Sequence, residues 1–261
     1  MAEPVASAGP GRLPGSGPVL AGQVRYQLLL TMRNPRALVA GVALPLLLLV
    51  LASSQHAHLA VSALAGRVVL GVTLTAYLTH ASGLVAAREA GVLKRWRATP
   101  LSRWCYFAGR TCATVLMALA SGAVTVAAGA LAYHARLSAG AALSLLVALT
   151  LGALAWASVG TATTAVIPTA DAAQPVLSLS YFPVMLLSGV LGAFRGAPSW
   201  LSTLLGYLPG QPTLDAVTRA LHTTGTTLSL PGHDLAVLAG WAIGALLASL
   251  RLFQWEPRTP R

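Results

Sequence analysis

The side chains in this chain with the clearest chemical use are the charged residues of one short run. Residues 88–101 read REAGVLKRWRATPL and include Lys94, the only lysine in the protein. The run lies between two long apolar stretches, in a chain where only 9% of the residues are charged. A short basic loop between membrane spans fixes which side faces the cytoplasm. It is also a place where a soluble partner can bind a membrane protein.

The residues needed for ATP binding, ion coupling or catalysis are missing from the places where they would act. A Walker A loop needs a Gly-Lys pair followed by Ser or Thr, whereas Lys94 stands between Leu93 and Arg95. His80 is the one titratable residue well inside an apolar stretch, and a lone histidine beside threonines is more typical of a structural hydrogen-bonding residue than of a proton carrier. We therefore expect no catalytic residue, no metal site and no cofactor in this chain.

The bulk composition indicates an integral membrane protein. Of the 261 residues, 56% are hydrophobic and the mean hydropathy is +0.71, whereas an average soluble domain has about 25% charged residues. The net charge of +11 does not indicate a nucleic-acid partner, because the positive residues lie between apolar stretches rather than on one polar face. The expected surroundings are a lipid bilayer.

Six apolar stretches are candidates for membrane spans. A helical span needs about 20 mostly apolar residues, and the candidates are residues 37–53, 68–87, 107–133, 139–167, 172–194 and 234–250. With both termini inside, 13 of the 17 Lys and Arg residues fall on the inner side and the other 4 on the outer side. This pattern predicts an all-α polytopic protein of the plasma membrane with six transmembrane helices and both termini in the cytoplasm.

The segments around these spans divide the chain further. Residues 1–19 are rich in Gly, Pro, Ala and Ser and predict a disordered tail. Residues 20–253 form one transmembrane domain, and residues 254–261 form a cytoplasmic tail. Within the domain, Leu20–Met32 predicts an interfacial helix, because Asn34-Pro35 separates it from the first span. The alternative is a cytoplasmic extension of that span.

A 39-residue outer segment and several small or proline residues carry further expectations. Residues 195–233, between the fifth and sixth spans, predict two short amphipathic helices that dip into the outer leaflet, with a structured outer lid as the alternative. Gly240 and Gly244 have a spacing that permits close helix approach. Pro175 and Pro183 remove backbone hydrogen bonds from the fifth span, which predicts either a hinge or a static kink.

Two stretches together resemble the type-2 ABC transporter permeases. The charged run, followed by Tyr106, Gly109 and Arg110, resembles the loop after the second span of these proteins. The stretch FPVMLLSGV at residues 182–190 and the residues after it resemble their fifth span and outer segment. The resemblance covers roughly residues 20–253. One departure is the sequence GQPT at residues 210–213, where such chains often carry a bulkier apolar run, and this leaves the shape of the outer segment open.

The resemblance implies a transport subunit rather than an enzyme. Such a permease would export a hydrophobic or amphipathic compound, drug-like or antibiotic-like. ATP and Mg would be bound by a separate ABC ATPase subunit, and a second permease copy, giving a homodimer, would complete the exporter. The alternative is a membrane scaffold or sensor protein without transport activity.

The resemblance also implies roles for particular residues. The loop after the second span would hold the coupling helix that docks on the ATPase, with the residues Arg88, Glu89, Gly91, Leu93, Lys94, Arg95, Trp96, Arg97 and Pro100. In this segment the charged side chains offer polar contacts, Leu93 and Trp96 offer apolar anchors, and Pro100 ends the helix. The translocation path would lie between two permeases, and its candidate lining residues are Thr73, Tyr77, His80, Ser178 and Tyr181.

Overall fold

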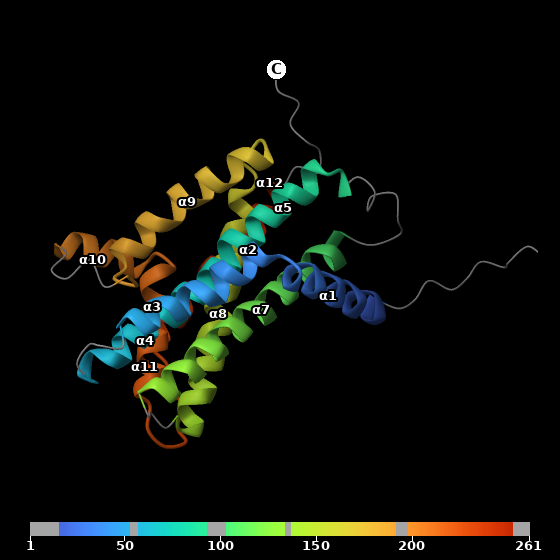
Figure 1. Ribbon diagram of the computed structural model, residues 1–261. Helices are drawn as coiled ribbons and strands as arrows, with labels where there is room; N and C mark the ends of the chain where they lie inside the picture. Colours follow the sequence, from blue (N-terminus) through green and yellow to red (C-terminus); the bar gives the residue numbers. More distant parts are fainter. Residues whose placement is uncertain (1–15, 53–56, 93–102, 134–136, 192–197, 253–261) are drawn as a thin grey trace, which may run out of the picture.

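The computed structural model describes residues 16–52, 57–92, 103–133, 137–191 and 198–252. Within these ranges every regular element is a helix (Figure 1), as the all-α prediction requires. Among the described residues, three helices are long and apolar enough to cross a membrane, namely Val61–Glu89, Cys105–Ala132 and Ala139–Thr163. Two shorter apolar helices, Val39–Leu51 and Gly232–Ala248, lie where the first and sixth spans are expected. The count of six spans stays a prediction.

Most of the helices extend beyond the stretches expected from the sequence. The first apolar stretch comprises α2 (Pro35–Leu38), η1 (Val39–Ala43) and α3 (Leu44–Ala52), and the second comprises α4 (Ala57–Thr73), η2 (Leu74–Thr79) and α5 (His80–Glu89). The others are α7 (Arg103–Ala132), α8 (Ala139–Thr163), α9 (Ala170–Leu187) and α12 (Gly232–Leu252). The second helix begins eleven residues before the apolar stretch at 68–87, so residues 57–67 are helical as well. By contrast α9 ends at Leu187, since Gly189 adopts a φ of 75° that breaks the helix.

The second apolar stretch forms the centre of the bundle. Contacts with α3, α7, α8 and α11 surround α4, η2 and α5. Fully buried side chains follow one another along it, including Val68, Val69, Val72, Tyr77 and Leu84. Both η1 and η2 are π-helical turns, which insert one extra residue per turn and often mark functional positions. Nothing in the apolar pattern predicted them.

A proline in the first stretch is accommodated by a serine from another helix. Pro45 has no N–H, so the carbonyl of Gly41, four residues earlier, lacks the donor that an α-helical turn would supply. The hydroxyl of Ser121 on α7 donates to that carbonyl. The lack of a side chain at Gly71 lets α4 come close to the first stretch, because a Cβ there would lie 2.9 Å from Pro45 and 2.8 Å from the Gly41 oxygen. Ser121 thus satisfies a backbone group where hydrocarbon offers no partner.

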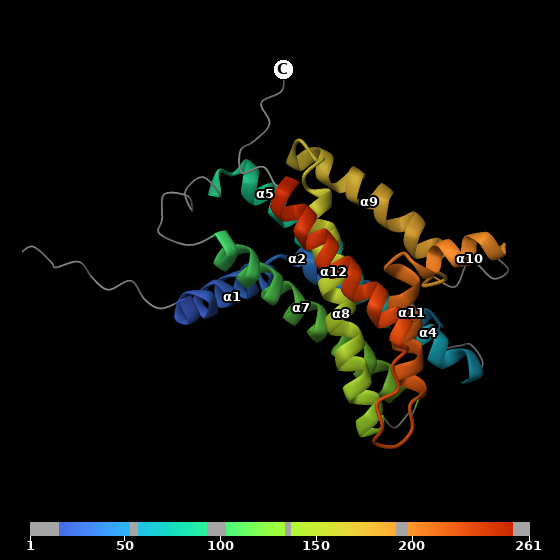
Figure 2. The ribbon, with the colours of Figure 1, turned by 180° about the vertical axis from the view of Figure 1, so that it is seen from behind.

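The N-terminal helix α1 (Ser16–Met32) lies along α7 and presents its polar side to the bundle. This helix begins at Ser16, so it includes the last four residues of the tail expected at residues 1–19, and residues 1–15 lie outside the described ranges. Gln23 and Gln27 are buried, whereas Tyr26, Leu29 and Met32 are exposed. An apolar face turned outward favours a helix lying at the membrane interface over a plain extension of the first span. Figures 1 and 2 show α1 and α9 on opposite flanks of the bundle.

The outer segment contains two helices, as the sequence predicts, but they are used differently. In α10 (Ser199–Gly206), Trp200 and Leu204 are exposed, as expected for a helix that dips into lipid. In α11 (Gly210–His222), Ala216, Val217 and Ala220 are fully buried against α8, α4 and α12. α11 therefore packs into the outer end of the bundle. The outer segment thus combines one helix exposed as for the outer leaflet, α10, with one that covers the bundle as a lid would, α11.

A half-buried carboxyl on α11 gives the outer segment a pH dependence. Burial raises the pKa of Asp215 above its ordinary value of 3.8, nearby Asp234 raises it further, and Gln211 and Arg219 act in the other direction. Because the pKa is raised in the folded state, the folded chain binds the proton more tightly, and ionisation of Asp215 destabilises the fold as pH rises. We expect Asp215→Asn to raise the melting temperature at neutral pH. The gain should shrink as pH falls toward the ordinary pKa.

The measurement is a series of melting curves of the detergent-solubilised protein between pH 4 and pH 8, on the original chain and the variant. Asp171→Asn, which removes an exposed carboxylate at the start of α9, is the matched control. A gain for Asp215→Asn that is the same at every pH would contradict the raised pKa.

Candidate translocation and coupling sites

Three of the predicted path residues meet in one buried cluster between the second stretch and α9. The hydroxyls of Thr73 and Tyr181 lie 2.6 Å apart. The rings of Tyr77 and Tyr181 stack with centroids 5.8 Å apart, and Trp156 of α8 meets both rings edge-on. We call Thr73, Tyr77, Trp156 and Tyr181 the tyrosine cluster. Within this cluster, Thr73 and Tyr181 are in contact although they lie 108 positions apart in the chain.

The tyrosine cluster is closed in this structure. Tyr77 is 1% exposed and Tyr181 is 0% exposed, so neither lines an open passage within a single chain. The hydroxyl of Tyr77 lies 2.7 Å from that of Ser180 on α9 and donates to Thr163 on α8 over 3.2 Å. These hydroxyls would become available to a polar group only if α9 moved away from the second stretch.

Ser178, the serine proposed from the sequence, lies beside the cluster rather than in it. Its hydroxyl accepts a long contact of 3.5 Å from Gln174 on the same helix. Ser180 occupies the position facing Tyr77 instead. Leu177, Tyr181 and Met185 form the buried stripe of α9, and both serines flank that stripe. The helical period alone does not decide which flank meets Tyr77, because that depends on how α9 crosses η2.

His80 belongs to a different group, on the opposite side of the second stretch. Its two ring nitrogens lie 2.7 Å from the hydroxyl of Thr114 and 3.0 Å from that of Thr161. The guanidinium of Arg110 donates to the His80 carbonyl at 3.1 Å and to Gln27 of α1 at 3.3 Å. Among the described residues no carboxylate pairs with Arg110. Both nitrogens of His80 are thus occupied by hydroxyls, which favours the structural role over proton transfer.

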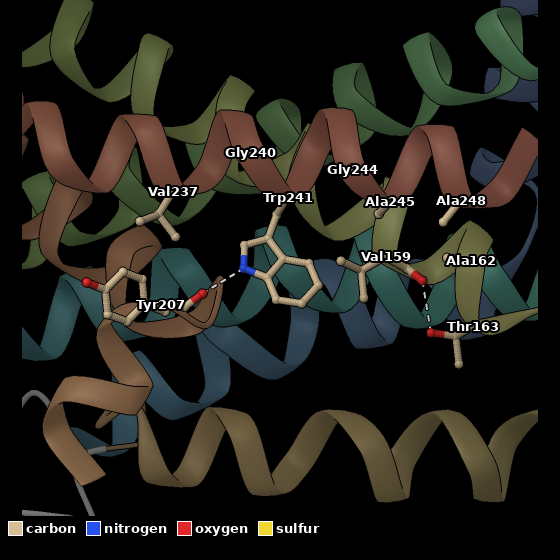
Figure 3. Close-up of a pocket in the computed structure, with 10 residues that line it drawn as sticks. All are labelled: Val159, Ala162, Thr163, Tyr207, Val237, Gly240, Trp241, Gly244, Ala245 and Ala248. Atoms are coloured by element: carbon tan, nitrogen blue, oxygen red, sulfur yellow. Dashed lines mark hydrogen bonds between the residues drawn. The ribbon is translucent and has the colours of Figure 1, made fainter. Parts of the chain in front are cut away.

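An apolar groove runs between α8 and α12 (Figure 3). Its volume is about 470 Å³ and its lining includes Val159, Val237, Trp241 and Ala245. Figure 3 shows the Trp241 indole reaching from α12 into the groove, where its N–H donates to the Tyr207 carbonyl over 2.7 Å. Gly240 and Gly244 line the same groove and have open space beside their Cα atoms. Their spacing therefore shapes a hollow within this chain and does not bring two of its helices together.

The expected coupling segment is described only at its start. Leu93, Lys94, Arg95, Trp96, Arg97 and Pro100 lie outside the described residues. At the end of α5, the Ala90 N–H bonds the Ala86 carbonyl at 3.0 Å and the Gly91 N–H bonds the Arg88 carbonyl at 3.1 Å. Gly91 has a φ of 66°, a left-handed conformation that closes helices and favours glycine. The helix therefore ends at the point where the resemblance places the coupling loop.

Arg88 and Glu89 point in a direction that the sequence did not indicate. Arg88 is 3% exposed, and its guanidinium contacts the chain between α8 and α9. The Glu89 carboxylate accepts a hydrogen bond from the Ala170 N–H at 3.0 Å, at the start of α9. Both side chains thus serve contacts within the chain. No sequence signal identifies these partners, because they are backbone groups more than 70 residues away.

Comparison with known proteins agrees with this arrangement. No curated protein matches the chain. The family model described as "ABC-2 type transporter" matches residues 23–221, from α1 to the end of α11. The match spans well over half of the 261 residues and includes both the tyrosine cluster and the end of α5. The chain belongs to the ABC-2 type transporter family, whose members are membrane components of ABC transporters.

Proposed function

We propose that this chain is the permease subunit of an ABC exporter, driven by ATP that a separate ABC ATPase hydrolyses. The family match over residues 23–221 carries the proposal. The position of the charged run supports it, because the run begins in the last two residues of α5 and ends just before α7. The segment from Gly91 to Pro100 would dock on the ATPase, with Leu93 and Trp96 as apolar anchors. ATP and Mg would bind on the ATPase alone.

The proposed cargo is a hydrophobic or amphipathic compound of the drug or antibiotic type. The groove between α8 and α12 supports an apolar cargo, since only Thr163, Tyr207 and Trp241 bring polar groups to its lining. A second copy of the chain would complete the path, giving a homodimer in the plasma membrane with all termini in the cytoplasm. Thr73, Tyr77, Ser178 and Tyr181 would line the path, with His80 as a structural neighbour, once α9 has moved.

Alternating access would then rest on α9. This helix packs chiefly against α5 and η2 and meets Trp156 of α8 through Tyr181, so its separation from the bundle would open the tyrosine cluster. Pro175 and Pro183 are both accommodated within continuous helix, and they would act as hinges if α9 bends during the cycle. Binding of ATP would favour one arrangement of α9 over the other by contacting the coupling segment differently in the two states.

The test is to co-express the tagged chain with candidate ABC ATPases from the same genome and to purify the complex through the permease. We expect one ATPase to co-purify stoichiometrically and to hydrolyse ATP. If the permease purifies alone while every candidate ATPase stays behind, the exporter proposal fails and the scaffold or sensor alternative takes its place.

A further inference from the structure

Two adjacent residues of opposite charge at the end of α5 each hold the end of a different helix. Arg88 donates to the carbonyl of Thr164 at 3.1 Å, to that of Pro168 at 3.4 Å, and also to that of Ile167. Glu89 accepts from the Ala170 N–H at 3.0 Å. The three carbonyls follow the end of α8, and Ala170 is the first residue of α9. Together the two side chains hold the whole connection between α8 and α9.

The signs of the charges match the helix ends that they meet. The C-terminal end of a helix carries unpaired carbonyls and a partial negative charge, and the N-terminal end carries unpaired N–H groups and a partial positive charge. The guanidinium of Arg88 meets the carbonyl of Thr164, the C-cap of α8, and the carboxylate of Glu89 meets the first amide of α9. Hydrogen bonds with a charged partner are about twice as strong as neutral ones. Exchanging the two residues would place each charge at the wrong end.

Arg88 and Glu89 lie between the proposed docking segment and the helix whose movement would open the tyrosine cluster. Gly91, two residues after Glu89, begins the segment proposed to dock on the ATPase, while α9 is the helix that closes the tyrosine cluster. Beyond this connection α9 packs chiefly against α5 and η2. A displacement of the docking segment can therefore be passed to the start of α9 through Glu89, and to the chain just before α9 through Arg88.

We propose that Arg88 and Glu89 are positioning residues that clamp the end of α5 to the start of α9, so that α9 follows the coupling segment when ATP binds. The inference rests on the proposed function. It differs from a docking role, in which the same two charges would contact the ATPase directly. Arg88 is too deeply buried for such a contact to be its main one.

Conservative and non-conservative variants of Glu89 separate the two roles. Glu89→Gln keeps an oxygen that accepts from the Ala170 N–H but removes the charge, whereas Glu89→Ala removes both. The clamp requires the acceptor, which the charge only strengthens, so Glu89→Gln should keep most of the ATP response and Glu89→Ala should lose it. A docking role that depends on charge predicts that both variants fail. Arg88→Lys, which cannot reach three carbonyls with one fork, should fall between the original and Arg88→Ala.

The experiment follows the movement of α9 without any cargo. A single cysteine replaces Ser178 in a chain with Cys105→Ser and Cys112→Ser, which removes the two native cysteines. The complex with its ATPase is reconstituted in lipid nanodiscs, and a water-soluble maleimide alkylates the cysteine with and without ATP, using a hydrolysis-deficient ATPase. We expect ATP to change the alkylation rate at least about fivefold in the parent chain and in Glu89→Gln. In Glu89→Ala and Arg88→Ala the change should be less than about twofold, with the ATPase still bound in full amount.

The outcomes separate the inference from the function on which it rests. Failure of any ATPase to bind the parent chain would overturn the proposed function. Binding to the parent together with an unaltered ATP response in Glu89→Ala would overturn the clamp alone, as would loss of the ATPase from that variant. Absence of an ATP response at position 178 in the parent would overturn it too. Glu89 is exposed, so its variants keep the test open if Arg88→Ala fails to fold, and Arg33→Ala, which removes an exposed arginine, is the control.

Discussion

Reversing the charges of Lys94, Arg95 and Arg97 to glutamate should abolish co-purification of the ATPase while the permease still inserts into the membrane. Removing one member of a buried, hydrogen-bonded charge pair at an interface costs about 2–5 kcal/mol, and about 1.4 kcal/mol is a tenfold change in affinity. Three reversals in one docking segment should therefore weaken binding by well over tenfold. The measurement is the ratio of ATPase to permease after purification, with ATP hydrolysis as the second readout.

Insertion should survive the triple reversal. The inner side would keep ten of its thirteen basic residues against four outside, and acidic residues contribute little to orientation. The matched control reverses Arg251, Arg258 and Arg261, which removes the same number of positive charges near the C-terminus. Equal loss of ATPase from both triple variants would show that total charge matters, and the docking segment would lose its assigned role.

Truncating Tyr181 to alanine should be among the most destabilising single changes in the chain. Its ring is fully buried, stacks on Tyr77 and meets Trp156 edge-on. Replacing a buried aromatic residue by alanine typically costs about 3–5 kcal/mol, because neighbouring groups close the cavity only in part. Within a bilayer this packing is the main attraction between helices, since lipid tails are as apolar as the side chains. Melting of the detergent-solubilised protein, followed by size-exclusion chromatography, measures the loss.

Two variants show which part of the residue matters. Tyr181→Phe keeps the ring and removes only the contact with Thr73, which retains its hydrogen bond of 2.8 Å to the Val69 carbonyl. The loss should be about 0.5–1.5 kcal/mol. Phe182→Ala truncates the next ring along α9, which is 45% exposed, and should have a smaller effect than Tyr181→Ala. Equal melting temperatures for the two alanine variants would contradict the packing argument.

The sequence was most informative where one physical property extends over many residues. Apolar length located all the long helices, because about 20 apolar residues have few alternatives to crossing a bilayer. Thr73, Tyr77 and Tyr181 were chosen as path candidates and lie together in the structure, while their role in a path stays a prediction. The separate places of His80 and Ser178 were not predicted. Which neighbour a helical side chain meets depends on the crossing of two helices, and this information is absent from either helix alone.

The roles of the charged residues were the hardest to predict. The resemblance placed Arg88 in the docking loop, and a basic residue at the end of a span is ordinarily expected to face water or a partner. The burial of Arg88 depends on three carbonyls in the α8–α9 connection, which no pattern near this residue reveals. The π-helical turns η1 and η2 were missed for a related reason, because inserting one residue into a turn leaves the apolar composition unchanged.

The bond from Ser121 to the Gly41 carbonyl has a consequence for the order of biogenesis. When the first stretch leaves the ribosome, the helix that will satisfy its proline-freed carbonyl has not yet been synthesised, since Ser121 follows 80 residues later. Until then that carbonyl needs water or part of the insertion machinery as a partner. The bond therefore favours entry of the first three hydrophobic segments into the lipid together over early release of the first segment alone.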